Sequence, residues 1–179
     1  MGLCQALGNI SRLLIVGATT IALALSILTA MSCELVKVDD EASGSTWGFF
    51  FQDSITNGGT CQDTVFSTED EMILAGRTCL IVSICAGFIA GVMVTFEWLC
   101  CEICCARVLE GIAFFLAWAF GGISFLFYGS DLCTVDDKEC SFNDASGFMT
   151  AAVILYFGCS IVLCLAPEPD PICRRSSKD

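Results

Sequence analysis

Four cysteines lie within six residues of the chain, in the sequence CCEICC, as Cys100, Cys101, Cys104 and Cys105. Thiols this close together can bind a metal, form disulfides or accept a lipid. Structural zinc sites usually take their two pairs of ligands from separate turns or elements, and disulfides are rare in a reducing cytosol. The chemistry of this segment therefore depends on the side of a membrane on which it lies.

The apolar residues of the chain are gathered into four long blocks. Hydrophobic residues make up 55% of the sequence and charged residues 16%, whereas soluble domains carry about 25% charged residues. A helix needs about 20 apolar residues to cross a bilayer core. The blocks predict four membrane-spanning helices, at residues 13–31, 79–99, 108–128 and 147–166, with two outer loops, at residues 32–78 and 129–146.

We therefore expect one tetraspan domain over residues 1–179, an all-α integral membrane four-helix bundle. A signal peptide cleaved before Cys33 is an alternative for the first block, because small residues precede that position. The block is as long as a full span, and every fourth residue from Ala18 to Ala30 is small. Such a stripe is typical of helix packing in lipid, so a retained span is the favoured interpretation.

Basic residues near the span ends predict the orientation. Four spans bring both termini to one side, and that side carries Arg12, Arg107, Arg174, Arg175 and Lys178, against three basic residues in the two outer loops. Positively charged flanks stay in the cytoplasm. Both termini are therefore expected to be cytoplasmic, in a multi-pass protein of the plasma membrane.

The predicted outer surface is strongly acidic. The outer loops hold fourteen acidic and three basic residues, which gives a net charge of −11 out of −12 for the chain. A chain without a basic patch is not expected to bind nucleic acid. The acidic runs at 39–41, 69–71 and 136–137 could bind divalent cations weakly, but none has the spacing of an EF-hand loop. The simpler interpretation is that these acidic runs are solvated surface charge and bind no cation.

The predicted topology sorts the cysteines by compartment. Cys33, Cys61, Cys133 and Cys140 lie outside, in an oxidising environment, and we expect disulfides Cys33–Cys61 and Cys133–Cys140, although four cysteines allow three connectivities. The cysteines within the spans are expected to be small packing residues.

On the cytoplasmic side, cysteines beside a membrane helix are the usual acceptors for S-palmitoylation. The candidates for lipidation are Cys100, Cys101, Cys104, Cys105, Cys4 and Cys173. Plain juxtamembrane cysteines and a metal site are the weaker alternatives, and no metal ligand set or cofactor is predicted.

The long outer loop predicts a small disulfide-linked antiparallel β-sheet. Alternating residues in CELVKVDD, the aromatic segment TWGFFFQDS and TCQDTVFS form three candidate strands, and TNGG is a hairpin signal. Trp47, Phe49, Phe50 and Phe51 have two interpretations. They cover the outer ends of the helices, or they bind a partner.

The span interiors contain no charged residue that would mark an ion route. Glu97 and Glu110 lie near the cytoplasmic ends, where they can reach headgroups or Arg107. Gly87 and Gly91 allow close helix packing. The chain has no histidine and no nucleophile with an identifiable base, so we do not expect an enzyme.

This layout resembles the claudin and peripheral-myelin-protein superfamily, with cytoplasmic termini, a long first outer loop and a very short inner loop. The segment from Trp47 to Phe51, followed by Cys61, is similar to the tryptophan and cysteine motif of the claudin first loop, except that Cys33 precedes the tryptophan. The cysteine pair in the second outer loop also differs from claudins. Palmitoylated cysteines after the second and fourth spans are a further feature that the resemblance implies.

The resemblance implies a non-enzymatic protein that acts in lateral or cell–cell association and in membrane organisation. Its partners would be the lipid bilayer, further copies of itself in a homo-oligomer, or other membrane proteins. The alternative is an ion channel or an auxiliary channel subunit whose acidic outer face attracts cations.

Overall fold

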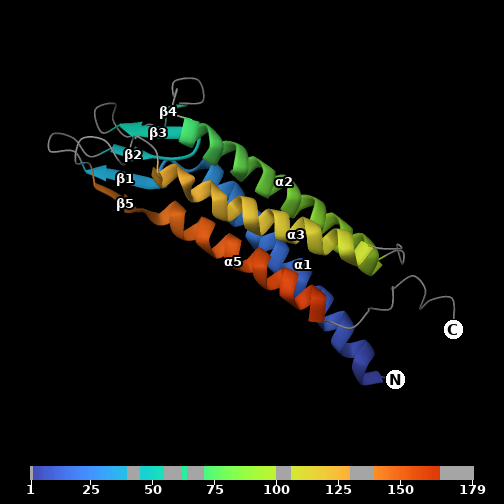
Figure 1. Cartoon of the computed structure of the whole chain (residues 1–179). Helices are drawn as coiled ribbons and strands as arrows, with labels where there is room; N and C mark the ends of the chain where they lie inside the picture. The colour runs from blue at the N-terminus through green and yellow to red at the C-terminus, as the bar shows by residue number, and fades with distance from the viewer. Residues whose placement is uncertain are drawn as a thin grey trace.

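Four long helices form an elongated bundle in the computed structural model, which describes residues 2–39, 45–54, 62–63, 71–99, 106–129 and 139–165 (Figure 1). The helices are α1 (Gly2–Met31), α2 (Glu71–Leu99), α3 (Ala106–Ile123) and α5 (Asp144–Leu165), and the 3-10 helix η2 (Ser124–Gly129) continues α3. Each is long and apolar enough to cross a membrane, over Gly8–Met31, Glu71–Leu99, Ala106–Tyr128 and Asp144–Leu165. The prediction of a four-helix, multi-pass membrane architecture is confirmed.

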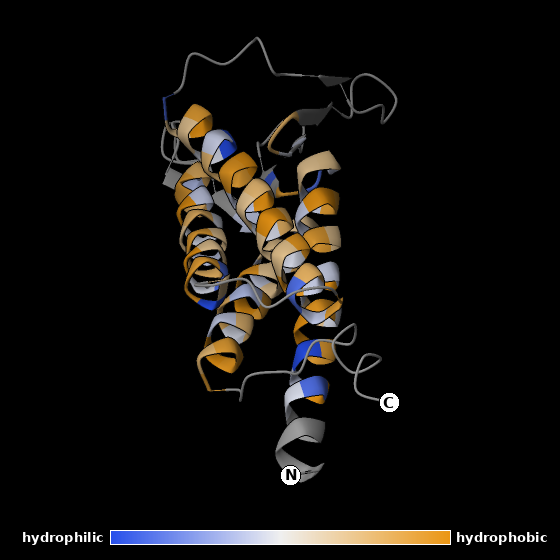
Figure 2. Cartoon of the chain, turned by 90° about the vertical axis from the view of Figure 1, so that its right-hand side faces the viewer, coloured by the Kyte–Doolittle hydropathy of each residue, from blue (hydrophilic) through white to orange (hydrophobic). Residues whose placement is uncertain are grey.

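The outer surface of the bundle is apolar. Figure 2 shows hydrophobic residues along the length of the helices, with hydrophilic residues gathered mostly toward their ends. Leu14, Phe88, Phe115 and Ile154 are each more than half exposed. An apolar surface of this extent suits lipid and not water.

The helices extend beyond the apolar blocks that predict them. Helix α1 begins at Gly2, ahead of residue 13, and α2 begins at Glu71, ahead of residue 79. Glu71 lies in the first turn of α2, where a negative charge is stabilised by the helix dipole. As a result Arg12 and Arg77 lie within helices and are almost fully buried.

One antiparallel sheet joins the two outer loops. Its strands are β1 (Val36–Asp39), β2 (Ser45–Trp47), β3 (Phe51–Ser54), β4 (Gln62–Asp63) and β5 (Glu139–Phe142), in the order β4-β3-β2-β1-β5. Strand β1 pairs on one side with β2, Val36 opposite Trp47, and on the other with β5, Val36 opposite Phe142. The second loop therefore supplies an edge strand that the expected three-stranded meander did not include.

The aromatic segment that predicts one strand contains two, β2 and β3. Gly48 follows β2 at a point where the chain lies against the backbone of Ser32 and Cys33, and a Cβ on Gly48 would overlap the Ser32 carbonyl oxygen. Only glycine allows this close approach. The chain turns here and returns as β3, antiparallel to β2.

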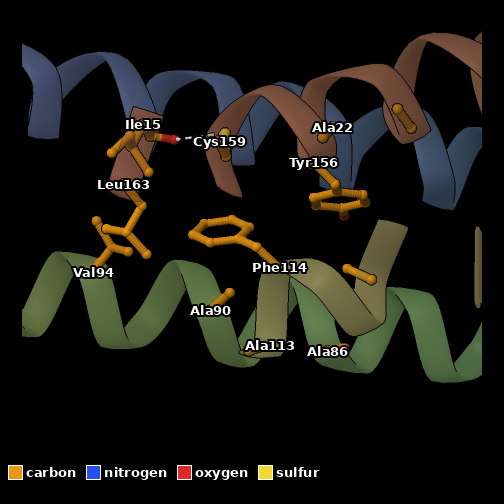
Figure 3. Close-up of a cluster of buried hydrophobic side chains, with 12 residues drawn as sticks. Ile15, Ala22, Ala86, Ala90, Val94, Ala113, Phe114, Tyr156, Cys159 and Leu163 are labelled. Carbon is orange, nitrogen blue, oxygen red and sulfur yellow. Dashed lines mark hydrogen bonds between the residues drawn. The ribbon is translucent and has the colours of Figure 1, made fainter. Parts of the chain in front are cut away.

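Small and aromatic side chains fill the interior of the bundle. Each helix packs against two others, α1 and α3 both lying between α2 and α5, so α1 and α3 face each other diagonally. In the central cluster, Phe114 and Tyr156 lie among buried alanines (Figure 3). Gly87 makes room for Tyr156, because a Cβ there would overlap the phenol ring. Close approach at small residues is how helices pack in lipid.

Candidate functional site

Three charged side chains meet inside the bundle at the end opposite the sheet, which we call the far end. Arg12 of α1 donates from Nη1 to Oε2 of Glu110 on α3 at 2.7 Å, and its Nη2 lies 2.5 Å from Oε2 of Glu97 on α2. Arg12 is 1% exposed, Glu110 0% and Glu97 12%. We call these three residues the far-end triad.

Helical periodicity places Arg12 in this position. The buried residues of α1 recur at alternating spacings of four and three, as Gly8, Arg12, Ile15, Thr19, Ala22, Ser26 and Thr29. This is the spacing of a helix face that packs against neighbouring helices. Arg12 therefore points toward the bundle axis and reaches diagonally to Glu110 on α3.

Glu110 occupies the equivalent stripe of α3, after Ala106 and before Ala113 and Ala117, all of which are buried. Its Oε2 contacts Arg12, while its Oε1 is buried and accepts no hydrogen bond from the residues that the structure describes. An unpaired buried carboxylate oxygen is costly, and each such atom calls for a physical explanation.

The far-end triad corrects two expectations from the sequence. Glu110 was expected to reach headgroups or Arg107, whereas it contacts Arg12, and Arg107 donates from Nε to the Leu163 carbonyl oxygen at 3.2 Å. The sequence also places Arg12 ahead of a first span at residues 13–31, whereas it lies within the candidate span Gly8–Met31; Glu97 and Glu110 lie near the ends of their spans, as expected.

A second buried arginine lies at the end of the bundle that carries the sheet. Arg77 of α2 is 5% exposed. It donates from Nε to the carbonyl oxygen of Phe49, and its guanidinium lies 5.9 Å from the centre of the Phe50 ring. Phe49 itself packs edge-to-face against Phe127, with ring centres 5.4 Å apart. These contacts attach the first outer loop to the helices.

The structure describes the side chains of two of the four aromatic residues that were predicted either to cover the helix ends or to bind a partner. Phe49 is 1% exposed and covers the helix ends, so it offers no surface to a partner. Phe50 is half-buried next to Arg77. Trp47 and Phe51 lie in β2 and β3, but their side chains are outside the described part of the structure.

The predicted outer cysteines are described only in part. Cys33 is buried and takes part in a disulfide bond. Cys140 lies in β5, opposite Val38, but its side chain is not described. Cys61 and Cys133 lie outside the described residues, so the two pairings stay predictions.

The predicted lipidation sites also fall outside what the structure describes. They are Cys173, the side chain of Cys4 in α1, and the four cysteines at 100, 101, 104 and 105. Among the span cysteines, Cys159 is buried and packs as expected, with its thiol 3.9 Å from the Ile15 carbonyl oxygen. Cys85 and Cys164 are instead exposed on the lipid-facing surface.

The far-end triad can therefore hold three helices together and exchange a proton, and the Arg77 contacts can fix the sheet in place.

No protein-family model matches the chain, and no curated protein matches it either.

Proposed function

We propose that this chain is a non-enzymatic, claudin-like tetraspan protein that associates with other membrane proteins, or with further copies of itself, through its outer sheet. The observation that carries the proposal is the single sheet built from both outer loops, with β5 paired to β1. Two loops joined in one sheet present a single continuous surface, which suits recognition better than two separate loops.

The sheet is held firmly on the helices, as a recognition surface requires. Leu35, which precedes β1, is 1% exposed and packs with Phe127 and Leu80. Its carbonyl oxygen accepts hydrogen bonds from the Tyr128 hydroxyl at 3.0 Å and from the Asn143 amide at 3.3 Å. Preorganisation of this kind lowers the entropy lost on binding.

The charge of the outer loops indicates what partner would fit. Under the proposed orientation, with the sheet outside and both termini cytoplasmic, the loops carry a net charge of −11. Like charges disfavour face-to-face contact between two copies, and complementary charge favours a basic partner. Self-association would then use the edge strands β4 and β5, where backbone groups supply the pairing.

The rest of the proposal concerns covalent chemistry. Disulfides Cys33–Cys61 and Cys133–Cys140 would stabilise the outer loops, and the disulfide at Cys33 supports an oxidising environment for the sheet. Acylation in the segment 100–105 would favour one membrane environment in the plasma membrane or at a cell junction.

The alternative, a channel or an auxiliary channel subunit, has less support. Phe114 and Tyr156 fill the middle of the bundle and are both 0% exposed (Figure 3). A conducting path through one copy would have to displace them. An auxiliary role remains compatible with the acidic outer loops.

The proposal can be tested with a glycan placed on the sheet. Lys37 is exposed on β1, and Lys37→Asn with Asp39→Thr creates the glycosylation sequence Asn-Val-Thr. The control is Lys37→Asn alone, which has no acceptor sequence. Association is measured by cross-linking and co-purification of two differently tagged copies, expressed in one cell or in two mixed cell populations.

We expect glycosylation of the double variant and loss of association relative to the control. A double variant that reaches the cell surface without a glycan would contradict the orientation. A glycosylated variant that associates as well as the control would contradict recognition through this face. Wild-type protein that purifies as a monomer, without a partner after cross-linking, would contradict the proposal itself.

A further inference from the structure

The far-end triad contains one more negative than positive charge. Two carboxylates, Glu97 and Glu110, face one guanidinium, that of Arg12. Burying an ionised group without compensation costs so much that such groups usually become neutral instead. The surplus charge therefore needs a cation, and the smallest cation is a proton.

The geometry matches a proton shared by two carboxylates. The Oε2 atoms of Glu97 and Glu110 contact the two terminal nitrogens of the same guanidinium, at 2.5 and 2.7 Å. The rigid, planar guanidinium holds the two carboxylates beside each other, where their charges repel unless one is neutralised. In addition, Oε1 of Glu110 is buried and has no hydrogen-bond partner among the described residues.

We propose that the far-end triad is a proton-binding site, in which one proton is held between Glu97 and Glu110 while Arg12 stays charged. On binding, a hydronium ion from the solvent transfers its proton to one carboxylate oxygen, so that an O–H bond forms there and a neutral water molecule leaves. The site then contains one cation, one carboxylate and one carboxylic acid, and its net charge is zero. Glu97, at 12% exposure, is the route by which the proton enters.

Other titratable groups on α3 and α5 lie near the site, and one of them, the Tyr156 hydroxyl, is buried without a hydrogen-bond partner among the described residues. On α3, Arg107 donates to the Leu163 carbonyl oxygen of α5. On α5, the Cys159 thiol lies near Thr19 and Ile15, the Tyr156 ring lies against Gly87, and Cys164 is exposed. Residues 100–105, which include Glu102, lie outside the described part of the chain.

Proton binding here is coupled to how tightly three helices close. Arg12, Glu97 and Glu110 come from α1, α2 and α3, and α1 and α3 face each other diagonally. With the proton bound, the guanidinium draws both side chains inward. Without it, repulsion between the carboxylates opposes closure, so the far end loosens as pH rises.

The site is tested directly by infrared difference spectroscopy of the full-length protein in lipid nanodiscs, between acidic and alkaline pH. Wild type is expected to show the carbonyl stretch of a protonated carboxyl group at neutral pH, sensitive to deuterium exchange. The single variants Glu97→Gln and Glu110→Gln should both lose this band, because the remaining carboxylate then balances Arg12. Glu71→Gln, which alters an exposed carboxylate at the other end of α2, is the matched control and should keep it.

Thermal unfolding gives an independent measurement. If the folded state binds a proton that the unfolded state releases, stability falls as pH rises, and this fall should be absent in both glutamine variants. A wild-type spectrum without the band would contradict the proposal, as would a band that persists in both variants. Stability that depends on sodium concentration at fixed pH, without the band, would identify a metal cation as the occupant and also overturn it.

Discussion

The two ends of the bundle each bury an arginine, but the groups that stabilise its charge differ. At the far end, Arg12 contacts carboxylates from two other helices. At the sheet end, Arg77 contacts a backbone carbonyl oxygen of the outer loop and lies over an aromatic ring. The first arrangement links helix to helix through side chains, and the second links a helix to a loop mainly through backbone.

This difference determines how many positions at each end require a particular residue type. The far-end triad needs one particular residue on each of three helices, and removing Arg12 leaves two buried carboxylates without their cation. A backbone carbonyl is present whatever residue occupies position 49, so the Arg77 contact requires only a loop that returns to the same place. We infer that the far end constrains residue identity, whereas the sheet end constrains loop geometry.

Arg12→Ala is expected to have the largest effect, because it leaves two buried carboxylates without their cation. Removing one partner of a buried ion pair typically costs about 3–5 kcal/mol. The midpoint of thermal unfolding in nanodiscs should fall steeply, and less protein should reach the cell surface. The measurement is unfolding followed by the fluorescence of the tryptophans.

The matched control is the triple variant Arg12→Met, Glu97→Gln and Glu110→Gln, which removes charge of both signs. Replacing a whole buried ion cluster by uncharged groups often changes the free energy of unfolding only slightly. The triple variant should therefore be more stable than Arg12→Ala. Equal stability of the two would mean that Arg12 acts through packing and not through charge.

Phe49→Ala is the corresponding test of packing at the sheet end. It opens a cavity against Phe127, and loss of a buried phenylalanine typically costs about 3 kcal/mol or more. Hydrogen exchange should rise in residues 45–54 and 139–142 and stay unchanged around Glu110. The control is Phe115→Ala, which removes an exposed ring from the lipid-facing surface and should change little. Faster exchange at both ends would show that the two regions are not independent.

The spans were predictable from the sequence because they depend on length and hydropathy, which are local properties. The buried face of α1 was also partly visible, since the small-residue stripe includes Ala22 and Ser26, both fully buried. The buried face itself alternates steps of four and three residues, and that alternation continued back from Ala22 reaches Arg12, whereas the four-residue spacing of the stripe leads to Leu14 instead. The small-residue stripe alone therefore does not indicate that Arg12 is buried.

The partners of the two arginines were not predictable, because they depend on contacts distant in sequence. Arg12 and Glu110 are 98 positions apart. No local feature of the sequence indicates which helix lies diagonally opposite α1. The pairing of β5 with β1 is another long-range contact. The split of one aromatic segment into β2 and β3 follows from Gly48 meeting the backbone of Ser32, which is also a tertiary contact.

Arg77→Met should weaken the attachment of the outer loop and should lower the stability less than Phe49→Ala does. It leaves the buried Phe49 carbonyl oxygen without this donor, and an unsatisfied buried group typically costs about 1–3 kcal/mol. We expect faster hydrogen exchange in residues 45–54, with the midpoint of helix unfolding little changed. Arg77→Lys separates charge from geometry, because lysine has no planar Nε donor. Full recovery by lysine would show that charge alone anchors the loop.

Arg107→Met is expected to have the smallest effect, and it tests which feature governs the comparison. Arg107 shares the far end with Arg12, but its Nε donates to a backbone carbonyl oxygen, that of Leu163, as Arg77 does at the sheet end. It is only half-buried, so water can replace the lost bond at a typical net cost of about 0.5–1.5 kcal/mol. If the type of bonding partner determines the effect of losing an arginine, Arg107→Met will behave like a weaker Arg77→Met. Hydrogen exchange will then be faster only in the last turn of α5, and the pH dependence of unfolding will not change. If position in the bundle decides, the variant will instead alter that pH dependence as the glutamine variants do. Unfolding profiles across pH for Arg107→Met beside Glu110→Gln distinguish the two, and we expect the Arg107→Met profile to run parallel to wild type.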